Sequence, residues 1–494
     1  MLSSKLHITD PLQLGYALER QLCLDSFYEF VQSFWGEIIA ETPVFNWHIE
    51  YLCSELQELA GFIVRKERKP YDIIINIPPG TTKTTIVTIM FPAWLWTQAP
   101  WIRIISNSYS GDLSIDHASK SKDIITSAKY KLFFPNVIIR RDNSGKGAYV
   151  NTEKGARYTT STGGTITGRH AHILLNDDPT NPKQADSDTE RETANRHTQT
   201  LSSRKVDKKG TPMITIMQRL HENDVTGFLL AKKAEHIRHI CLPAEVSDMV
   251  SPAYLKEKYI DGLLDVSRLD REVLDEAKID LGSRAYAGQY DQNPVAVGGN
   301  IVQNSWFRYM RREDFDKINT KNAKVTFFLD TAFTEKTNND PTGIIATCEL
   351  DGDLYILHAE KVRLKFPDLC RHIPEYVKAH GYTERSTIRI EPKANGISVV
   401  HQIKESTRLN VTEIKSDLLS DSKETRLNGV SPKIECGRVV LIRGGWNEEF
   451  VTEICGFPAK THDEYVDLIS YAIDYHLQPK QEPQDFEELE SMLY

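Results

Sequence analysis

A lysine and a threonine that follow a short apolar run have the clearest chemical potential in the first half of the chain. The apolar run DIIINI covers 72–77 and is followed by PPGTTKTT over 78–85, which contains Lys83 and Thr84. Backbone N–H groups of such a turn, and the N-terminus of the helix expected from Lys83, favour a bound phosphate. Lys83 would reach the terminal phosphates of a nucleotide, and the Thr84 hydroxyl would bind its Mg²⁺.

This loop departs from the standard phosphate-binding pattern GxxxxGK[ST] at both glycine positions. Ile77 and Thr82 occupy these positions, so Gly80 alone supplies the backbone freedom of glycine. An ordinary strand, turn and helix is therefore the alternative interpretation of this segment.

Two adjacent carboxylates follow another apolar run. HILLNDDP covers 172–179 and places Asp177 and Asp178 at the end of an expected strand. Parallel α/β sheets bind ligands at the carboxyl ends of their strands. A nucleotide hydrolase needs one carboxylate to hold Mg²⁺ and a group that orients water, so Asp177 and Asp178 fit these two tasks. A turn with a helix cap is the alternative.

Two further stretches suit a nucleotide site. TGGTITGR over 162–169 is rich in glycine and threonine, and IMQRLHENDVTG over 216–227 carries polar groups where a γ-phosphate sensor would lie. The alternatives are a plain hairpin and a polar helix start. An arginine often completes such sites. Arg169 is our first candidate and Arg219 the second.

A second group of carboxylates stands in the last third of the chain. Asp330 and Glu391 each end an apolar run, and Asp463 and Asp467 are spaced to lie on one face of a final helix. Acidic groups that converge from two strands and a helix suit two Mg²⁺ or Mn²⁺ ions and phosphodiester cleavage. We favour Asp467 as the third ligand, with Asp463 as the alternative. Any one of these acids could instead end a strand or cap a helix.

The elements that must position these residues alternate between strands and helices. Strands are expected at 72–77, 101–106, 171–177, 212–217, 324–330, 343–350, 353–360 and 387–391. Helices are expected at 11–40, 46–67, from 83, 110–127, 186–204, 367–380 and 463–477. This alternation predicts an α/β protein with a mostly parallel first sheet.

Composition limits the protein class. The 494 residues, with 40% apolar and 26% charged side chains, indicate a globular protein of several domains. A net charge of −9 excludes a generally basic nucleic-acid coat, but it allows a local basic strip. Seven scattered cysteines, none in a CxxC pair, favour neither a disulfide framework nor a zinc ribbon. We expect neither a signal peptide nor a membrane span.

The order of these motifs resembles that of the large subunit of tailed-bacteriophage terminases, from about Asn46 to about His476. The proposed nucleotide contacts that match the family's adenine-side segment and non-standard Walker A loop are Asn46, Trp47, His48, Pro79, Gly80, Thr81, Thr82, Lys83, Thr84 and Thr85. The run 162–179 resembles the family's Walker B region, and 216–227 its coupling motif. GQYDQNPV over 288–295 resembles the junction into the nuclease.

The resemblance implies an ASCE-type P-loop ATPase followed by an RNase H-like nuclease. Its metal ligands would be Thr84 and Asp177 at the ATPase site, with Asp330, Glu391 and Asp467 or Asp463 at the nuclease site. The ligands would be ATP with Mg²⁺, and two Mg²⁺ or Mn²⁺.

The implied function is packaging of double-stranded viral DNA into an empty capsid, with cutting of concatemeric DNA. The implied partners are DNA, a portal protein, a small terminase subunit and further copies of this chain in a ring, with no membrane. The location would be the host cytoplasm and, transiently, the procapsid portal. DNA contacts could come from Arg65, Lys66, Arg68 and Lys69, from Arg140 and Arg141, or from Arg311 and Arg312.

Three other functions stay open at this point: a nuclease with a degenerate ATPase domain, a helicase-like ATPase, and a capsid scaffold. The expected domains are an ATPase over 1–242, a helical connector over 243–300, a nuclease over 301–478 and an acidic tail over 479–494.

Overall fold

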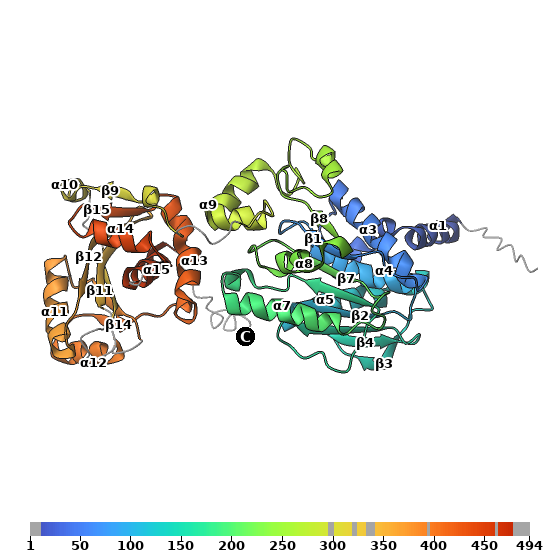
Figure 1. The fold of residues 1–494 in the computed structure, drawn as a ribbon, viewed down its shortest axis with the longest axis horizontal. Coiled ribbons are helices and arrows are strands. Elements are labelled where there is room, and N and C mark those ends of the chain that lie inside the picture. Colours follow the sequence, from blue (N-terminus) through green and yellow to red (C-terminus); the bar gives the residue numbers. More distant parts are fainter. Residues whose placement is uncertain are drawn as a thin grey trace, which may run out of the picture. The chain divides into compact units, whose positions relative to one another are not determined.

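The computed structural model describes residues 11–294, 301–318, 324–331, 341–392, 396–459 and 463–477. The chain divides into two compact units, Met1–Ala296 and Val297–Tyr494, and each is described by itself (Figure 1). The acidic tail and the glycine pair Gly298–Gly299 lie outside the described residues.

The first unit is built on an eight-stranded sheet with the order β3-β4-β5-β2-β6-β7-β1-β8. The strands are β1 (Asp72–Asn76), β2 (Arg103–Ser108), β3 (Ile139–Ser144), β4 (Ala148–Asn151), β5 (Ala156–Ser161), β6 (Ile173–Asp177), β7 (Met213–Met217) and β8 (Ile237–Cys241). The pairs among β5, β2, β6, β7, β1 and β8 are all parallel, and β3 and β4 pair antiparallel at one edge. The prediction of a mostly parallel sheet is confirmed.

The sheet order places one strand between the two that carry the predicted nucleotide motifs. β7 lies between β1, which leads into the phosphate loop, and β6, which ends at Asp177. This additional strand is the feature that the term ASCE names. All residues of β1, β6 and β7 are buried, which explains their nearly continuous apolar sequence.

Helices pack against both faces of this sheet. They are α1 (Pro11–Asp25), α2 (Phe27–Phe34), α3 (Trp47–Val64), α4 (Phe91–Gln98), α5 (Gly111–Thr126), α6 (Ala128–Phe133), α7 (Asp188–Ser202), α8 (Val225–Lys233) and α9 (Arg271–Gln289). Short 3-10 turns are η1 (Trp35–Glu37), η3 (Pro182–Gln184), η4 (Ala234–His236) and η5 (Ala253–Lys258). The helix expected from Lys83 forms, but its segment η2 (Thr85–Met90) is a π-helix.

The expected helical connector over 243–300 is helical only in part. Its described residues contain the short η5 and the longer α9, and left-handed backbone at Asp261 and Gly262 prevents a continuous helix between them. Leu255, Leu263 and Tyr286 of this segment are buried in the core of the first unit.

The second unit is built on a seven-stranded mixed sheet with the order β14-β13-β10-β11-β12-β15-β9. Its strands are β9 (Arg308–Met310), β10 (Thr326–Asp330), β11 (Thr342–Leu350), β12 (Asp353–Val362), β13 (Thr387–Ile390), β14 (Val411–Glu413) and β15 (Val439–Ile442). β11 is antiparallel to both β10 and β12, and the other pairs are parallel.

Both faces of the second sheet are covered by helices (Figure 1). They are α10 (Arg312–Phe315), α11 (Phe366–Ala379), α12 (Gly396–Ser406), α13 (Lys423–Glu435), α14 (Asn447–Ile454) and α15 (Glu464–Leu477), with the turns η6 (Asn304–Trp306) and η8 (Asp417–Ser420). α11 and α12 share one apolar core with the sheet, and α13, α14 and α15 share the other. Among the described helices, none has the length and apolar character needed to cross a membrane.

Candidate functional sites

The loop after β1 contains two residues with left-handed backbone, and one of them is a threonine. Gly80 has a φ of 77° and Thr82 a φ of 63°, so both are left-handed. The Thr82 hydroxyl donates to the carbonyl of Thr81 at 2.6 Å, and the Thr81 hydroxyl donates to the carbonyl of Pro78 at 2.7 Å. These hydrogen bonds hold a conformation that costs a non-glycine residue roughly 1–2 kcal/mol.

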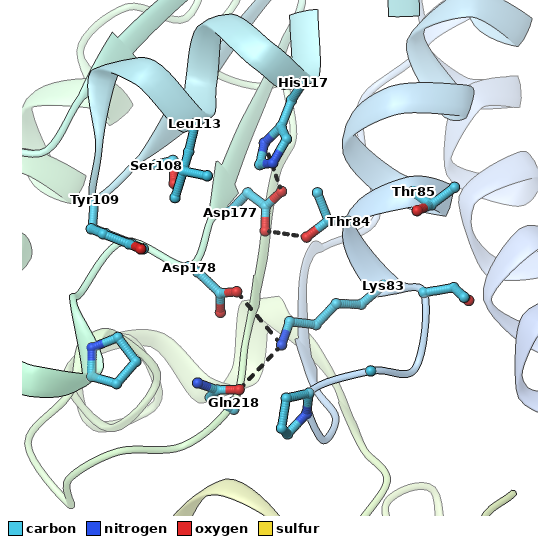
Figure 2. Close-up of a pocket in the computed structure, with 14 residues that line it drawn as sticks. Lys83, Thr84, Thr85, Ser108, Tyr109, Leu113, His117, Asp177, Asp178 and Gln218 are labelled. Carbon is cyan, nitrogen blue, oxygen red and sulfur yellow. Dashed lines mark hydrogen bonds and ion pairs between the residues drawn. The ribbon is translucent and has the colours of Figure 1, made fainter. Parts of the chain in front are cut away.

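This loop forms one wall of a cavity of about 410 Å³ (Figure 2). The residues around it are Pro79, Gly80, Thr82, Lys83, Thr84, Thr85, Ser108, Tyr109, Leu113, His117, Asp177, Asp178, Pro182 and Gln218. Most of the predicted nucleotide residues therefore meet in one place, and β2 and α5 contribute residues that the sequence did not indicate.

The charged groups of this cavity face one another across the ends of β1, β6 and β7 (Figure 2). The Lys83 Nζ lies 3.5 Å from an Asp178 carboxylate oxygen and 3.5 Å from the Gln218 Oε1. The Thr84 hydroxyl donates to the Asp177 carboxylate at 3.1 Å. Gln218 belongs to the stretch in which we predicted a γ-phosphate sensor.

A histidine of α5 lies next to Asp177. Burial, reinforced by the charge of Asp178, raises the pKa of Asp177 to about 7. Burial and the nearby guanidinium of Arg157 lower the pKa of His117 to about 4, so its imidazole is neutral. Its Nδ1 lies 3.6 Å from an Asp177 oxygen, and neither atom has a hydrogen-bond partner within the described parts of the chain. An unsatisfied carboxylate oxygen beside the Thr84 hydroxyl suits Mg²⁺, which prefers oxygen ligands.

The Asn46–Trp47–His48 segment supports the phosphate loop from behind and does not line the cavity. The buried His48 ring has its Nε2 3.2 Å from the carbonyl of Thr81, which is also buried and outside the lining. The Asn46 amide donates to the carbonyl of Leu264 at 2.6 Å.

Neither candidate arginine lines the cavity. Arg169 is exposed, and its guanidinium lies 4.4 Å from the centre of the Tyr158 ring. Arg219 is buried in an ion pair with Asp224 at 2.9 Å and also donates to backbone carbonyls. Arg219 therefore has a structural partner that accounts for its charge.

Sequence reasoning missed a fully buried arginine behind this site. Arg157 of β5 donates to the carbonyl of Thr88 at 2.7 Å. Thr88 belongs to the π-helix that follows the phosphate loop, and a π-helix leaves carbonyls without their usual α-helical donors. The sequence around Arg157, ARYTTS, has no apolar run, so it gave no signal for a buried position.

In the second unit, three predicted acids come together. The carboxylate oxygens of Asp330, Glu391 and Asp467 all lie within 4.8 Å of one another. β10 and β13 are parallel neighbours, and the Glu391 N–H donates to the carbonyl of Leu329 at 2.9 Å, so the first two acids meet at the strand ends. Asp467 reaches them from the first turn of α15.

The alternative ligand Asp463 lies outside this group of three. It directly precedes α15, and its carboxylate is 2.6 Å from the Lys423 Nζ. Lys423 also lies 2.8 Å from Asp467, so it bridges the two aspartates.

Basic and hydroxyl groups of α13 and α15 hold the acids in place. The Arg426 guanidinium is 2.9 Å from Asp467 and 3.9 Å from Glu391. The Tyr471 hydroxyl donates to Glu391 at 2.9 Å and itself accepts from Arg426. The sequence did not indicate these partners, because α13 is a polar helix without a recognisable motif.

The electrostatics of this site favour a bound cation. Burial, followed by the charge of Glu391, raises the pKa of Asp330 well above its usual range. Burial also raises the pKa of Asp467, although Lys423 and Arg426 oppose this shift. Oxygen ligands in this number suit hard divalent cations such as Mg²⁺ or Mn²⁺.

Comparison with known families identifies the second unit. Residues 328–476 match the terminase RNase H-like domain family, and this range contains Asp330, Glu391 and Asp467. The second unit is a terminase RNase H-like domain. The recognition of a terminase from its motif order is thereby confirmed, as is the RNase H-like class predicted for the second half.

Solved structures of similar fold include other terminases. The large terminase of a thermophilic bacteriophage is 12% identical, covers 86% of this chain and 99% of that chain, and has a TM-score of 0.49. The human cytomegalovirus terminase nuclease domain is 15% identical, and the match covers 35% of this chain and 96% of that chain with a TM-score of 0.27. The large terminase nuclease of thermophilic phage G20c is 13% identical, and the match covers 36% of this chain and 97% of that chain with a TM-score of 0.26. No curated protein matches the sequence.

Proposed function

We propose that this chain is an ATP-driven motor that moves double-stranded viral DNA into an empty capsid and cuts concatemeric DNA with its own endonuclease. The observation that carries this proposal is the presence of two separate acidic sites. One lies beside a phosphate loop in the first unit, and the other lies inside the terminase RNase H-like domain.

In the nuclease site, Asp330, Glu391 and Asp467 would hold two Mg²⁺ or Mn²⁺ ions. Such ions activate water and stabilise the leaving oxygen of a phosphodiester. Lys423 and Arg426 would orient Asp467, since both contact its carboxylate. Before the metal ions bind, the positive charges of Lys423 and Arg426 would also reduce the repulsion among the three carboxylates.

In the nucleotide site, Lys83 would contact the terminal phosphates of ATP, and Thr84 with Asp177 would hold its Mg²⁺. Asp178 would orient the attacking water. Gln218 lies within reach of Lys83 and opens the stretch that leads into α8, so it would report the γ-phosphate to the 186–230 region. The remaining predicted contacts, among them His48 and Thr81, would fix the loop from behind.

We retain Arg169 as the arginine that completes the ATP site, now in trans. Its exposed position outside the cavity of its own chain fits a role in the cavity of a neighbouring copy. This assignment agrees with a ring of copies docked on a portal protein. A small terminase subunit, a location in the host cytoplasm and the domain limits 1–242, 243–300, 301–478 and 479–494 belong to the same proposal.

Two matched variants test the proposal. Lys83→Ala should abolish ATP hydrolysis and leave Mn²⁺-dependent plasmid cutting intact, and Asp330→Ala should do the reverse. ATP hydrolysis that is unchanged in Lys83→Ala would remove the motor, and plasmid cutting by Asp330→Ala would remove the nuclease assignment. Unwinding of a fluorescent duplex by the wild type would favour a helicase instead.

The rival interpretation of a degenerate ATPase domain was motivated by Thr82 at a glycine position. The left-handed backbone of Thr82 weakens that motive, since the loop takes the conformation that glycine would give it.

A further inference from the structure

Three lysines converge on a single carboxylate at the beginning of β1, the end of the strand that lies away from the phosphate loop. The Lys233 Nζ is 2.9 Å from one Asp72 carboxylate oxygen, and the Lys205 Nζ is 3.5 Å from the other. Lys69 also forms an ion pair with Asp72. These lysines come from three separate segments, namely the loop after α3, the bridge after α7 and the end of α8.

The charges at this point do not balance. The side chains of Lys69, Lys205 and Lys233 are only 14%, 9% and 27% exposed, so bulk water screens them poorly. Asp72 is their shared carboxylate, and one of its oxygens also accepts the Met213 N–H at 2.8 Å. When all three lysines are protonated, their charge exceeds that of the single Asp72 carboxylate by two.

The pKa values of the group reflect this excess. Burial opposes the change, but the three lysines together lower the pKa of Asp72 to about 2. Burial lowers the pKa of Lys205 to about 7, because Asp72 offsets it only in part and Lys69 adds repulsion. A bound oxyanion would supply the missing negative charge.

Exposed cations extend this group over the neighbouring surface. The Lys69 N–H donates to the carbonyl of Lys209 at 3.1 Å, which joins the loop after α3 to the loop before β7. Arg68 and Lys208 on these loops and Lys232 at the end of α8 are exposed. We call these seven residues, Lys69, Lys205 and Lys233 with Arg68, Lys208, Lys209 and Lys232, the β1 lysine surface.

Beside these seven basic residues stand fewer acids, namely Asp72, Asp207, the exposed Glu235 and Glu67. Glu67 pairs with Arg65 at 2.9 Å, and an Asp207 oxygen accepts the Lys209 N–H at 2.9 Å. The surface therefore keeps a positive balance although the whole chain has a net charge of −9.

We propose that the β1 lysine surface binds the phosphate backbone of duplex DNA. Lysine ammonium groups act as point charges for phosphates and read no sequence, which suits a motor that must accept any DNA. The inference rests on the proposed function, and it adds a DNA contact on the first unit, outside both acidic sites.

The placement also links DNA to the nucleotide. β1 spans five residues from Asp72 to Asn76, about 17 Å at ~3.3 Å per residue, and then enters the phosphate loop. DNA would contact the residues at one end of this buried strand, and ATP would bind at its other end.

Fluorescence anisotropy tests this proposal. It measures the binding of a random-sequence duplex of about 30 base pairs at several salt concentrations. Lys233→Gln in the full chain should weaken binding and make the slope of log K against log salt less steep by about 1. The double variant Lys208→Gln with Lys232→Gln changes exposed residues only, so it covers the case in which Lys233→Gln destabilises the fold. Lys256→Gln is the matched control, a lysine 37% exposed and paired with Asp248 at 2.8 Å.

If both surface variants bind DNA as the Lys256→Gln control does, the proposal is wrong. It is also wrong if anionic phospholipid vesicles bind the wild type but not Lys233→Gln while duplex binding stays the same, since the surface would then serve a membrane. ATP hydrolysis and plasmid cutting by the wild type are measured in parallel. Their absence would remove the proposed function itself, whereas their presence with unaffected DNA binding would remove only this inference.

Discussion

Replacing Asp330 by asparagine should stabilise the second unit in the absence of divalent ions and abolish DNA cutting. The carboxylate oxygens of Asp330, Glu391 and Asp467 lie within 4.8 Å. At that separation, two like charges repel by roughly 3–4 kcal/mol if the effective dielectric constant is about 20. Asparagine keeps the shape of the side chain and removes one of these charges.

The pKa shift gives the same sign. Burial and Glu391 raise the pKa of Asp330 in the folded state, whereas the unfolded chain has an ordinary carboxyl pKa near 4. The unfolded state therefore gives up this proton first. The free energy of unfolding therefore falls as the pH rises from about 4, the pKa of the unfolded state, through the raised pKa of the folded state. At neutral pH, which lies above about 4, Asp330 already destabilises the fold. Asparagine should remove the part of this pH dependence that comes from Asp330, while the raised pKa of Asp467 keeps its own part.

The expected size of the effect is smaller than the full repulsion. Lys423 and Arg426 contact Asp467 and cancel part of the negative charge. A net gain of about 1–3 kcal/mol remains, which corresponds to roughly 3–10 °C in Tm for a unit of this size. Saturating Mn²⁺ should invert the order, because an ion at 1,000 times its Kd stabilises the wild type by about 4.1 kcal/mol.

Calorimetric melts of the full chain, in EDTA and in Mn²⁺, measure this crossing. Asp314→Asn is the control, since Asp314 is 54% exposed in the same unit and pairs only with the surface residue Lys317 among the ion pairs of the described chain. A lower Tm of Asp330→Asn in EDTA would refute the argument from repulsion. Equal stabilisation of wild type and variant by Mn²⁺ would refute the metal site.

Two further predictions concern the geometry of the nuclease site and the protonation of the nucleotide site. Gly396→Ala should reduce plasmid cutting at least tenfold and leave ATP hydrolysis unchanged. A Cβ at Gly396 would lie 1.9 Å from the carbonyl oxygen of Glu391, so Glu391 would have to move. A fully active nuclease would show that the site tolerates this shift of Glu391. Binding of Mg²⁺ with ADP, measured by titration calorimetry, should weaken about tenfold from pH 8 to pH 6, because Asp177 has a pKa of about 7 and must lose its proton to bind metal. Asp177→Asn should remove this pH dependence, and an equal dependence in the variant would assign it to another group.

The strand-end acids could be predicted from sequence because each combines a short apolar run with a carboxylate at its end. Asp177 and Asp330 end buried strands, and Glu391 directly follows one. The pairing of β10 with β13 was not needed for this prediction, since ligands collect at the carboxyl ends of parallel strands in general. Their convergence within 4.8 Å adds the geometry that sequence alone lacked.

The partners of these acids could not be predicted, because they depend on packing between elements far apart in sequence. Lys423 and Arg426 stand in a polar segment that resembles any exposed helix, yet the Arg426 side chain is only 3% exposed. The edge strand β3 was missed for a related reason. The sequence IRRDNS of β3 is mostly exposed and lacks the apolar run that marked the central strands.

Thr82 departs from the sequence motif of a phosphate loop, yet it has the left-handed backbone for which the motif uses glycine. The standard pattern places glycine before the lysine because a left-handed backbone is nearly free of cost for glycine alone. Here a β-branched residue takes that backbone, with a φ of 63°, while Gly80 two residues earlier has a φ of 77°. The buried His48, next to the Thr81 carbonyl, and the hydrogen bond from Thr81 to Pro78 tie down this part of the loop. Such strain persists only where the surroundings over-determine it, and it concentrates at functional sites. The departure that weakened the motif in the sequence therefore becomes, in the structure, an argument that this loop is held in shape for a ligand.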